Sequence, residues 1–95
     1  MNYNVLSFTT RSQYRIKALR QLQNRPQTPK EVTRAVDDAK MSDIARAIQQ
    51  LREKGLVELL VDEDVNKGRY YALTESGEEI LAEIEERRAE WGDLA

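Results

Sequence analysis

The sequence has 95 residues, 40% hydrophobic and 34% charged, with a formal net charge of −2, so we expect one soluble domain and no separate ligand-sensing domain. Cysteine and histidine are absent, which excludes disulfides, thiolate chemistry and the commonest zinc ligands. The sequence also has no phosphate-binding glycine loop. We therefore expect no metal, no cofactor and no enzymatic activity. No apolar run approaches the ~20 residues that cross a bilayer, and no signal peptide is recognisable, so we expect a cytoplasmic protein without a membrane partner.

The first eleven residues contain four apolar side chains, Tyr3, Val5, Leu6 and Phe8, with polar residues between them. This pattern is compatible with a short strand, a helical turn, or an arm that lies on the core of its own chain or of a partner. We predict an N-terminal arm or a short strand over residues 1–11.

A helix is predicted to follow from Ser12, which is a suitable N-cap, to about Asn24. Apolar residues at helical spacing define its inward side. They are Ile16, Ala18, Leu19 and Leu22. Pro26 ends the helix because proline is excluded from a helix interior.

The strongest helix start in the sequence is Thr28. Pro29 occupies the first helical position, where its missing amide hydrogen costs nothing, and Glu31 stands three residues after the cap. These residues predict a capping box. The helix is short and reaches about residue 36, and its predicted inward residues are Val32, Ala35 and Val36.

The segment from Lys40 to Gly55 predicts a third, amphipathic helix, with Ser42 as its N-cap and Gly55 in the left-handed conformation just after its end. Ile44, Ile48 and Leu51 form its apolar stripe. The opposite face consists of polar residues that suit the reading of base edges, namely Ser42, Arg46, Gln49, Gln50 and Glu53. An ordinary surface helix is the alternative interpretation of this segment.

Two β-type runs follow, residues 56–61 and 69–73, and the turn-rich sequence DEDVNKG separates them. Asn66 and Gly68 favour a β-hairpin over a helical hairpin, with Gly68 supplying a positive φ near the tip. Two helices, a third helix with a polar outer face and then a hairpin have the order of a winged helix-turn-helix. In that arrangement the third helix enters the DNA major groove.

Thr74 is expected to cap a last helix, which is rich in glutamate. Its apolar residues either cover the core of the same chain or contact a second chain. A helix of about eighteen residues extends beyond a core of this size at 1.5 Å per residue, so we predict a dimerisation element over residues 74–95. Its predicted contact residues are Ile80, Ile84, Arg88 and Trp91.

Charge is distributed unevenly along the chain. Residues 11–54 contain eleven Lys or Arg and five Asp or Glu, whereas residues 55–95 contain four and twelve. Because phosphates respond to the local field over roughly 8–10 Å, the basic first half favours nucleic-acid binding. The alternative is that the glutamate-rich last helix simply skews the count.

The run SDIARAIQQLREKGLVE, a hairpin ending in GRYYALTESG and a long helix together resemble the winged helix-turn-helix transcriptional regulators of bacteria and archaea. This group includes the MarR, ArsR and PadR types, and the resemblance spans about residues 12–91. Two patterns carry it: Arg46, Leu51, Gly55, Leu56 and Val57, and then Tyr71, Leu73, Thr74 and Gly77. The resemblance implies a third helix in the major groove and a wing on the adjacent backbone or minor groove.

The sequence departs from the regulators it resembles at three points. Ala45 stands where many members have serine or threonine, and the wing contains Asp62, Glu63 and Asp64, which repel phosphate unless they point away. The cysteines and histidines of the metal-sensing members are absent.

We therefore predict a mainly α fold with a small β-hairpin (α+β), with a winged helix-turn-helix over residues 12–73. The function predicted is that of a homodimeric, sequence-specific DNA-binding regulator, more specifically a repressor. The alternative is a winged-helix module that docks on another protein. The predicted DNA-contacting residues are Arg34, Lys40, Ser42, Asp43, Arg46, Gln49, Gln50, Lys67 and Arg69, with Arg52 or Lys54 adding positive charge.

Overall fold

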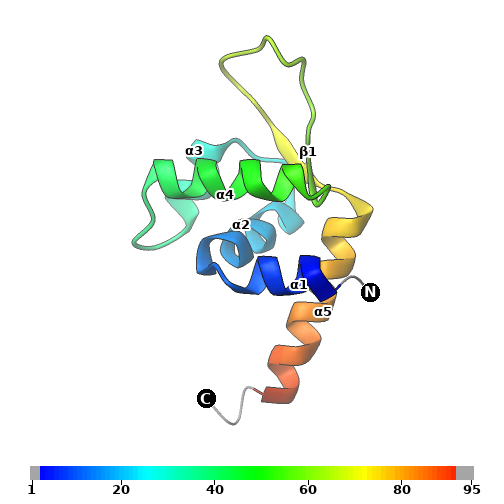
Figure 1. Cartoon of the computed structure of the whole chain (residues 1–95). Coiled ribbons are helices and arrows are strands. Elements are labelled where there is room, and N and C mark those ends of the chain that lie inside the picture. The colour runs from blue at the N-terminus through cyan, green and yellow to red at the C-terminus, as the bar shows by residue number, and fades with distance from the viewer. Residues whose placement is uncertain (1–2, 92–95) are drawn as a thin grey trace.

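A computed structural model describes residues 3–91 of the chain, and the side chains of residues 4–88. This part contains five helices and a two-stranded antiparallel sheet (Figure 1), so the predicted mainly α fold with a hairpin is confirmed. The elements are α1 (Tyr3–Thr10), α2 (Gln13–Asn24), α3 (Pro29–Ala35), α4 (Met41–Glu53), β1 (Val57–Leu59), β2 (Tyr71–Leu73) and α5 (Glu75–Trp91). None of these helices is long and apolar enough to cross a membrane.

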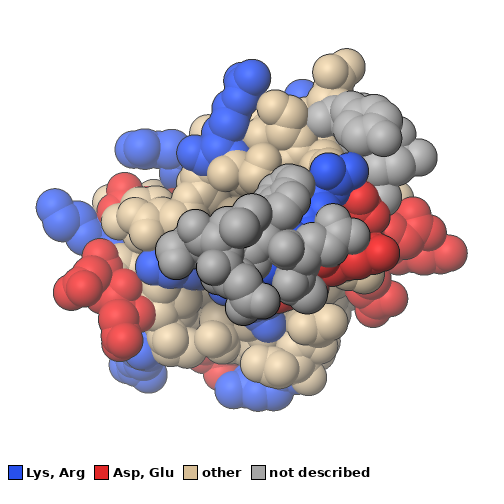
Figure 2. Space-filling model, turned by 90° about the horizontal axis from the view of Figure 1, so that it is seen from below, with Lys and Arg blue, Asp and Glu red and all other residues tan. Residues whose placement is uncertain are grey.

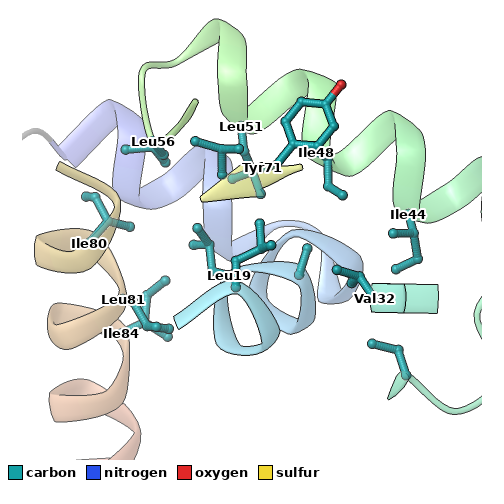
Figure 3. Packing of buried hydrophobic residues seen from close by; sticks show 14 of the residues in the cluster. Leu19, Val32, Ile44, Ile48, Leu51, Leu56, Tyr71, Ile80, Leu81 and Ile84 are labelled. Carbon is teal, nitrogen blue, oxygen red and sulfur yellow. The ribbon is translucent and has the colours of Figure 1, made fainter. Parts of the chain in front are cut away.

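The core is centred on α2, which contacts the four other helices and β2. Leu19 of α2 is fully buried, and Ile80, Leu81 and Ile84 point towards it from α5 (Figure 3). Burial of one such side chain contributes ~1.5–3 kcal/mol, whereas an exposed ion pair contributes ~0–1 kcal/mol. This apolar cluster, rather than the surface charges, therefore stabilises the fold.

Residues 3–10 form helix α1, so the predicted arm or short strand is wrong. Leu6 and Thr9 are buried and Val5 is partly buried, which places them on one helical face against the core. Thr9 Oγ1 donates a hydrogen bond to the Val5 carbonyl at 2.8 Å, so its hydroxyl is satisfied within the helix. The sequence was compatible with a strand, a helical turn or an arm, and packing on α2 and α5 selects the helix.

The two predicted caps at the starts of α2 and α3 are confirmed. Ser12 Oγ accepts a hydrogen bond from the Arg15 amide, and Thr28 and Glu31 form the reciprocal capping box. Ala35 was predicted to face inward, but it is exposed. The reason is that α3 ends there, and Val36 is buried from an extended backbone position instead.

The N-cap of helix α4 lies two residues before the predicted one. Lys40 is the N-cap, its carbonyl accepts from the amides of Asp43 and Ile44, and no side chain caps the helix. The prediction that Ser42 caps α4 is therefore wrong, and Ser42 lies exposed in the first turn. Serine was favoured by cap statistics, but the extended backbone of Lys40 fixes the start.

The predicted left-handed conformation of Gly55, just after the end of α4, is confirmed. Gly55 has a φ of 76°, its amide donates to the Arg52 carbonyl, and the Leu56 amide donates to the Leu51 carbonyl, both at 2.9 Å. These two bonds form a Schellman motif, which satisfies carbonyls that the helix leaves open. The chain then turns directly into β1.

The hairpin is confirmed, but its strands are shorter than predicted. Val57 pairs with Leu73 and Leu59 with Tyr71, and residues 60–70 form a loop that we call the wing. Gly68 has the expected positive φ of 67°. Figure 1 shows the wing and α5 extending from the core in opposite directions.

Thr74 connects the end of α4, the sheet and the start of α5. Its Oγ1 accepts from the Gly77 amide, which confirms the predicted cap of α5, and donates to the Gly55 carbonyl at 2.6 Å. Gly77 is buried because α5 crosses Leu56 so closely that an added Cβ would collide with the Leu56 carbonyl. The junction therefore fixes the direction of α5 relative to α4.

Candidate nucleic-acid interface

The polar face of α4 is uncovered in the single chain. Ser42, Arg46, Gln49 and Glu53 are exposed, while the apolar residues of the opposite face are buried. No other described residue makes a hydrogen bond or ion pair with the Arg46 side chain. In Figure 1 this helix lies at the outer surface, with the wing rising beside it.

A groove of ≈ 590 Å³ separates the start of α3, the outer face of α4 and the wing. Lys30 lies at the α3 side and Lys67 at the wing side, and Met41 and Gln49 contribute from α4. Both lysines are exposed. The groove therefore has a cationic group on each of two opposite walls.

Exposed cations surround the polar face of α4. Five of them make no ion pair with another described residue: Lys30, Arg34, Lys40, Arg46 and Lys67. Asp43 is half-buried in the first turn, where a carboxylate is favoured by the helix dipole. On the face opposite the wing, acidic and basic groups are both present (Figure 2). Cations that make no ion pair with a described residue therefore lie on α3, on α4 and on the wing.

Tyr71 connects the sheet to the polar face of α4. Its ring is buried in the core, and its hydroxyl points towards α4 (Figure 3). Gln49 Nε2 donates to this hydroxyl at 3.0 Å, and Arg69 Nε donates to it at 3.3 Å. One phenol oxygen thus holds a residue of α4 and a residue of the wing.

Arg69 was predicted to contact phosphate, and the structure places it within the wing. Its Nη1 donates to the carbonyls of Glu63 and Val65, both at 2.9 Å, so the guanidinium joins the two arms of the loop. The hydrogen bond to Tyr71 is the main reason that the pKa of Arg69 is raised. Arg69 therefore organises the wing itself.

The three acidic residues of the wing do not behave alike. Glu63 forms an ion pair with Arg52 of α4 and a longer one, at 3.7 Å, with Arg69. The hydrogen bond from Arg52 lowers the pKa of Glu63, and the same bond raises the pKa of Arg52. Asp62 and Asp64 are exposed. Only Glu63 is neutralised by partners.

Gln50 lies on the other flank of α4. Its Oε1 accepts from Arg15 Nε at 3.1 Å, and Arg15 Nη1 donates to the Phe8 carbonyl at 2.6 Å. The Arg15 guanidinium also stacks 3.7 Å from the centre of the Phe8 ring. Gln50 therefore ties α4 to α1 and α2, and the structure does not place it with Arg46 and Gln49.

Two of the predicted dimer contacts are wrong, because their side chains are buried in the core of the same chain. Ile80 and Ile84 are 5% and 2% exposed within the single chain, so a second copy has no access to them. Arg88 is exposed and stays a prediction. Trp91 ends α5, but its side chain lies outside the described residues.

Helices α2, α3 and α4, followed by the β1–β2 hairpin, define a winged-helix protein. This is the fold of MarR, HxlR and PadR regulators. The chain belongs to the family of the HVO_A0261 N-terminal domain, whose model matches residues 3–91. No curated protein matches the sequence.

Several solved structures share this fold at low sequence identity. The transcriptional regulator YodB from B. subtilis, in its reduced form, is 22% identical with a TM-score of 0.78, covering 95% of this chain and 87% of that one. A MarR-family regulator from Enterococcus faecalis V583 is 17% identical, with a TM-score of 0.79 and coverages of 97% and 83%. A PadR-family regulator from Clostridium difficile R20291 is 22% identical, with a TM-score of 0.67 and coverages of 87% and 91%.

Proposed function

We propose that this protein is a sequence-specific DNA-binding transcriptional regulator, with α4 in the major groove and the wing on the adjacent backbone. The observation that carries this proposal is the uncovered polar face of α4, with unpaired cations on both sides of it. The proteins that share its fold are described as transcriptional regulators, which supports the same conclusion. We propose no catalytic activity.

Arg46 and Gln49 are the proposed base-reading residues. Arginine pairs best with guanine and glutamine with adenine, and each good bidentate pair contributes ~1–3 kcal/mol of discrimination. Tyr71 engages the amide nitrogen of Gln49. An amide nitrogen has two hydrogens, so Gln49 keeps one donor and its carbonyl oxygen for a base.

The proposed phosphate contacts lie around these two residues. Lys40 and Ser42 stand at the positive end of α4, where a helix N-terminus favours an anion. Arg34 and Lys67 add charge on the α3 and wing sides. Such contacts carry no sequence information, but they make binding fall steeply with salt.

A homodimer is proposed through the part of α5 that lies beyond the core. Ile84 is its last buried described residue, and the helix continues to Trp91, about 10 Å further at 1.5 Å per residue. A two-fold dimer would read half-sites about one helical turn apart. Sedimentation equilibrium is expected to give the mass of two chains, and a monomer at micromolar concentration would contradict the dimer.

A protein-docking module is the second candidate. The exposed Asp62 and Asp64 at the wing and the glutamates of α5 favour it, because both repel DNA phosphate. Retention on immobilised heparin at low salt distinguishes the two functions. The DNA-binding protein is retained and elutes as salt is raised, whereas a docking module flows through.

The direct test is fluorescence anisotropy with duplexes that tile the region around its own gene. Arg46→Gln is expected to weaken the tightest complex about tenfold or more, because it removes one bidentate base contact. Lys17→Gln is the matched control, since Lys17 lies on α2 and, among the described residues, its side chain bonds only to Gln13. Equal losses in both variants would contradict the role of Arg46.

A further inference from the structure

Two arginines from separate elements converge on one carboxylate. Arg52 extends from the last turn of α4, and Arg69 extends from the second arm of the hairpin. Both guanidinium groups pair with the carboxylate of Glu63. Planar guanidinium groups that bind a carboxylate also match the geometry of a phosphate group.

The carboxylate lies on the solvent side of this cluster. The Glu63 side chain is 69% exposed, compared with 31% for Arg52 and 25% for Arg69. An incoming anion therefore meets Glu63 before it reaches either arginine. The cluster borders the proposed base-reading face, because Arg69 and Gln49 share the hydroxyl of Tyr71.

The arginine site persists without the Glu63 side chain. Arg69 is held by the main-chain carbonyls of Glu63 and Val65 and by Tyr71, none of which depends on the carboxylate. The Arg52 side chain makes no other hydrogen bond or ion pair with a described residue. Removing the carboxylate thus leaves one guanidinium fixed and the other available.

We infer that Arg52 and Arg69 form a binding site for a DNA backbone phosphate, and that Glu63 occupies this site in the free protein. On binding, the phosphate displaces the carboxylate. This inference rests on the proposed DNA-binding function. Glu63 thereby weakens binding to duplexes of any sequence, because its carboxylate must be displaced at every DNA site that the protein binds.

Glu63→Gln tests the inference, and Asp64→Asn is its matched control. Each removes one negative charge from the wing, but Asp64 is exposed and pairs with neither arginine. Glu63→Gln is expected to tighten binding to an arbitrary duplex about two- to fivefold at low salt, the scale of one exposed ion pair. The plot of log affinity against log salt should steepen by about 0.9, as for one further net positive charge.

A double variant tests whether the gain in affinity comes from Arg52, which loses its ion pair when Glu63 is replaced. Adding Arg52→Gln to Glu63→Gln is expected to abolish the gain in affinity. Circular dichroism melting curves confirm that each variant is folded. Gains that are equal in Glu63→Gln and Asp64→Asn, or weaker binding by Glu63→Gln, would overturn the inference while the DNA-binding function stands. Failure of the unmodified protein to bind any duplex would instead overturn the function and, with it, the phosphate site.

Discussion

Tyr71 belongs to both the core and the proposed interface. Its ring packs among buried apolar residues, while its hydroxyl accepts from Gln49 and Arg69. A buried tyrosine is expected to keep a partner for its hydroxyl. Here the two partners come from α4 and the wing, so one oxygen atom fixes the position of the wing relative to the base-reading face.

Tyr71→Phe separates these two roles. The ring remains, so we expect a loss of unfolding free energy of only ~0.5–1.5 kcal/mol, which is the contribution of a typical hydrogen bond. DNA affinity should fall because Gln49 and the wing lose their common support. Urea unfolding and anisotropy measure the two effects. Unchanged affinity would show that the hydroxyl does not position the interface.

The capping box of α3 is a second feature that depends on single residues, here Thr28 and Glu31. The amide of Thr28 donates to the carboxylate of Glu31, and this bond is the first cause of the lowered pKa of Glu31. A carboxylate with a lowered pKa adds stability above its unfolded pKa, about 4.3, and loses it as the pH falls through the folded value.

Thr28→Ala is expected to cost ~1 kcal/mol of unfolding free energy near neutral pH, the typical cost of losing an N-cap side chain. Thr28→Ala keeps the main-chain amide that donates to Glu31, so the pH-dependent part is tested with Glu31→Gln, which should destabilise the protein at neutral pH and lose this difference as the pH falls through the folded pKa of Glu31. Urea unfolding at pH 7 and pH 3 measures it. A difference that is constant with pH would contradict the coupling between the cap and the Glu31 carboxylate.

At the scale of elements, the predictions that succeeded rest on local signals. The helix caps of Thr28 and Thr74 and the turn at Gly55 involve backbone groups within a few residues, so neighbours along the chain are sufficient to identify them. The base of the hairpin depends on a distant contact. Tyr71 and Gln27 exchange two backbone hydrogen bonds, and no local pattern indicates this pairing.

The features that the sequence did not predict have the same physical origin. Helix α1 forms because its apolar face meets α2 and α5, and Gln50 is drawn away from the base-reading face by Arg15. Arg69 turns into the wing because two carbonyls face it there. Each outcome depends on a tertiary contact. The sequence therefore predicted which helix presents an uncovered polar face, but not which of its side chains are free.

A substitution at Gly77 tests the close crossing of α5 over Leu56. Gly77→Ala is expected to destabilise the protein by ~1–3 kcal/mol, because the added Cβ meets the Leu56 carbonyl and the elements must move apart. Ser76→Ala is the control, since Ser76 is the exposed neighbour in the same turn. Thermal melting compares the two. A Gly77→Ala variant as stable as Ser76→Ala would contradict the close crossing.

At the scale of the molecule, the basic first half of the sequence forms α2, α3 and α4, and the acidic second half forms the hairpin with its wing and α5. The described chain is elongated, 44 × 28 × 20 Å, with the wing and α5 extending in opposite directions (Figure 1). This separation keeps most of the glutamates away from the cations around α4. The small net charge therefore gives no measure of the potential at the interface.

The account depends most on DNA meeting the polar face of α4. A titration of the ¹⁵N-labelled protein with duplex DNA, followed by two-dimensional NMR, measures this directly. The largest shifts are expected at Ser42, Arg46 and Gln49 and at Lys67 of the wing, with little change along α5. Shifts confined to α5, or none in α4 while the duplex is bound, would contradict the account.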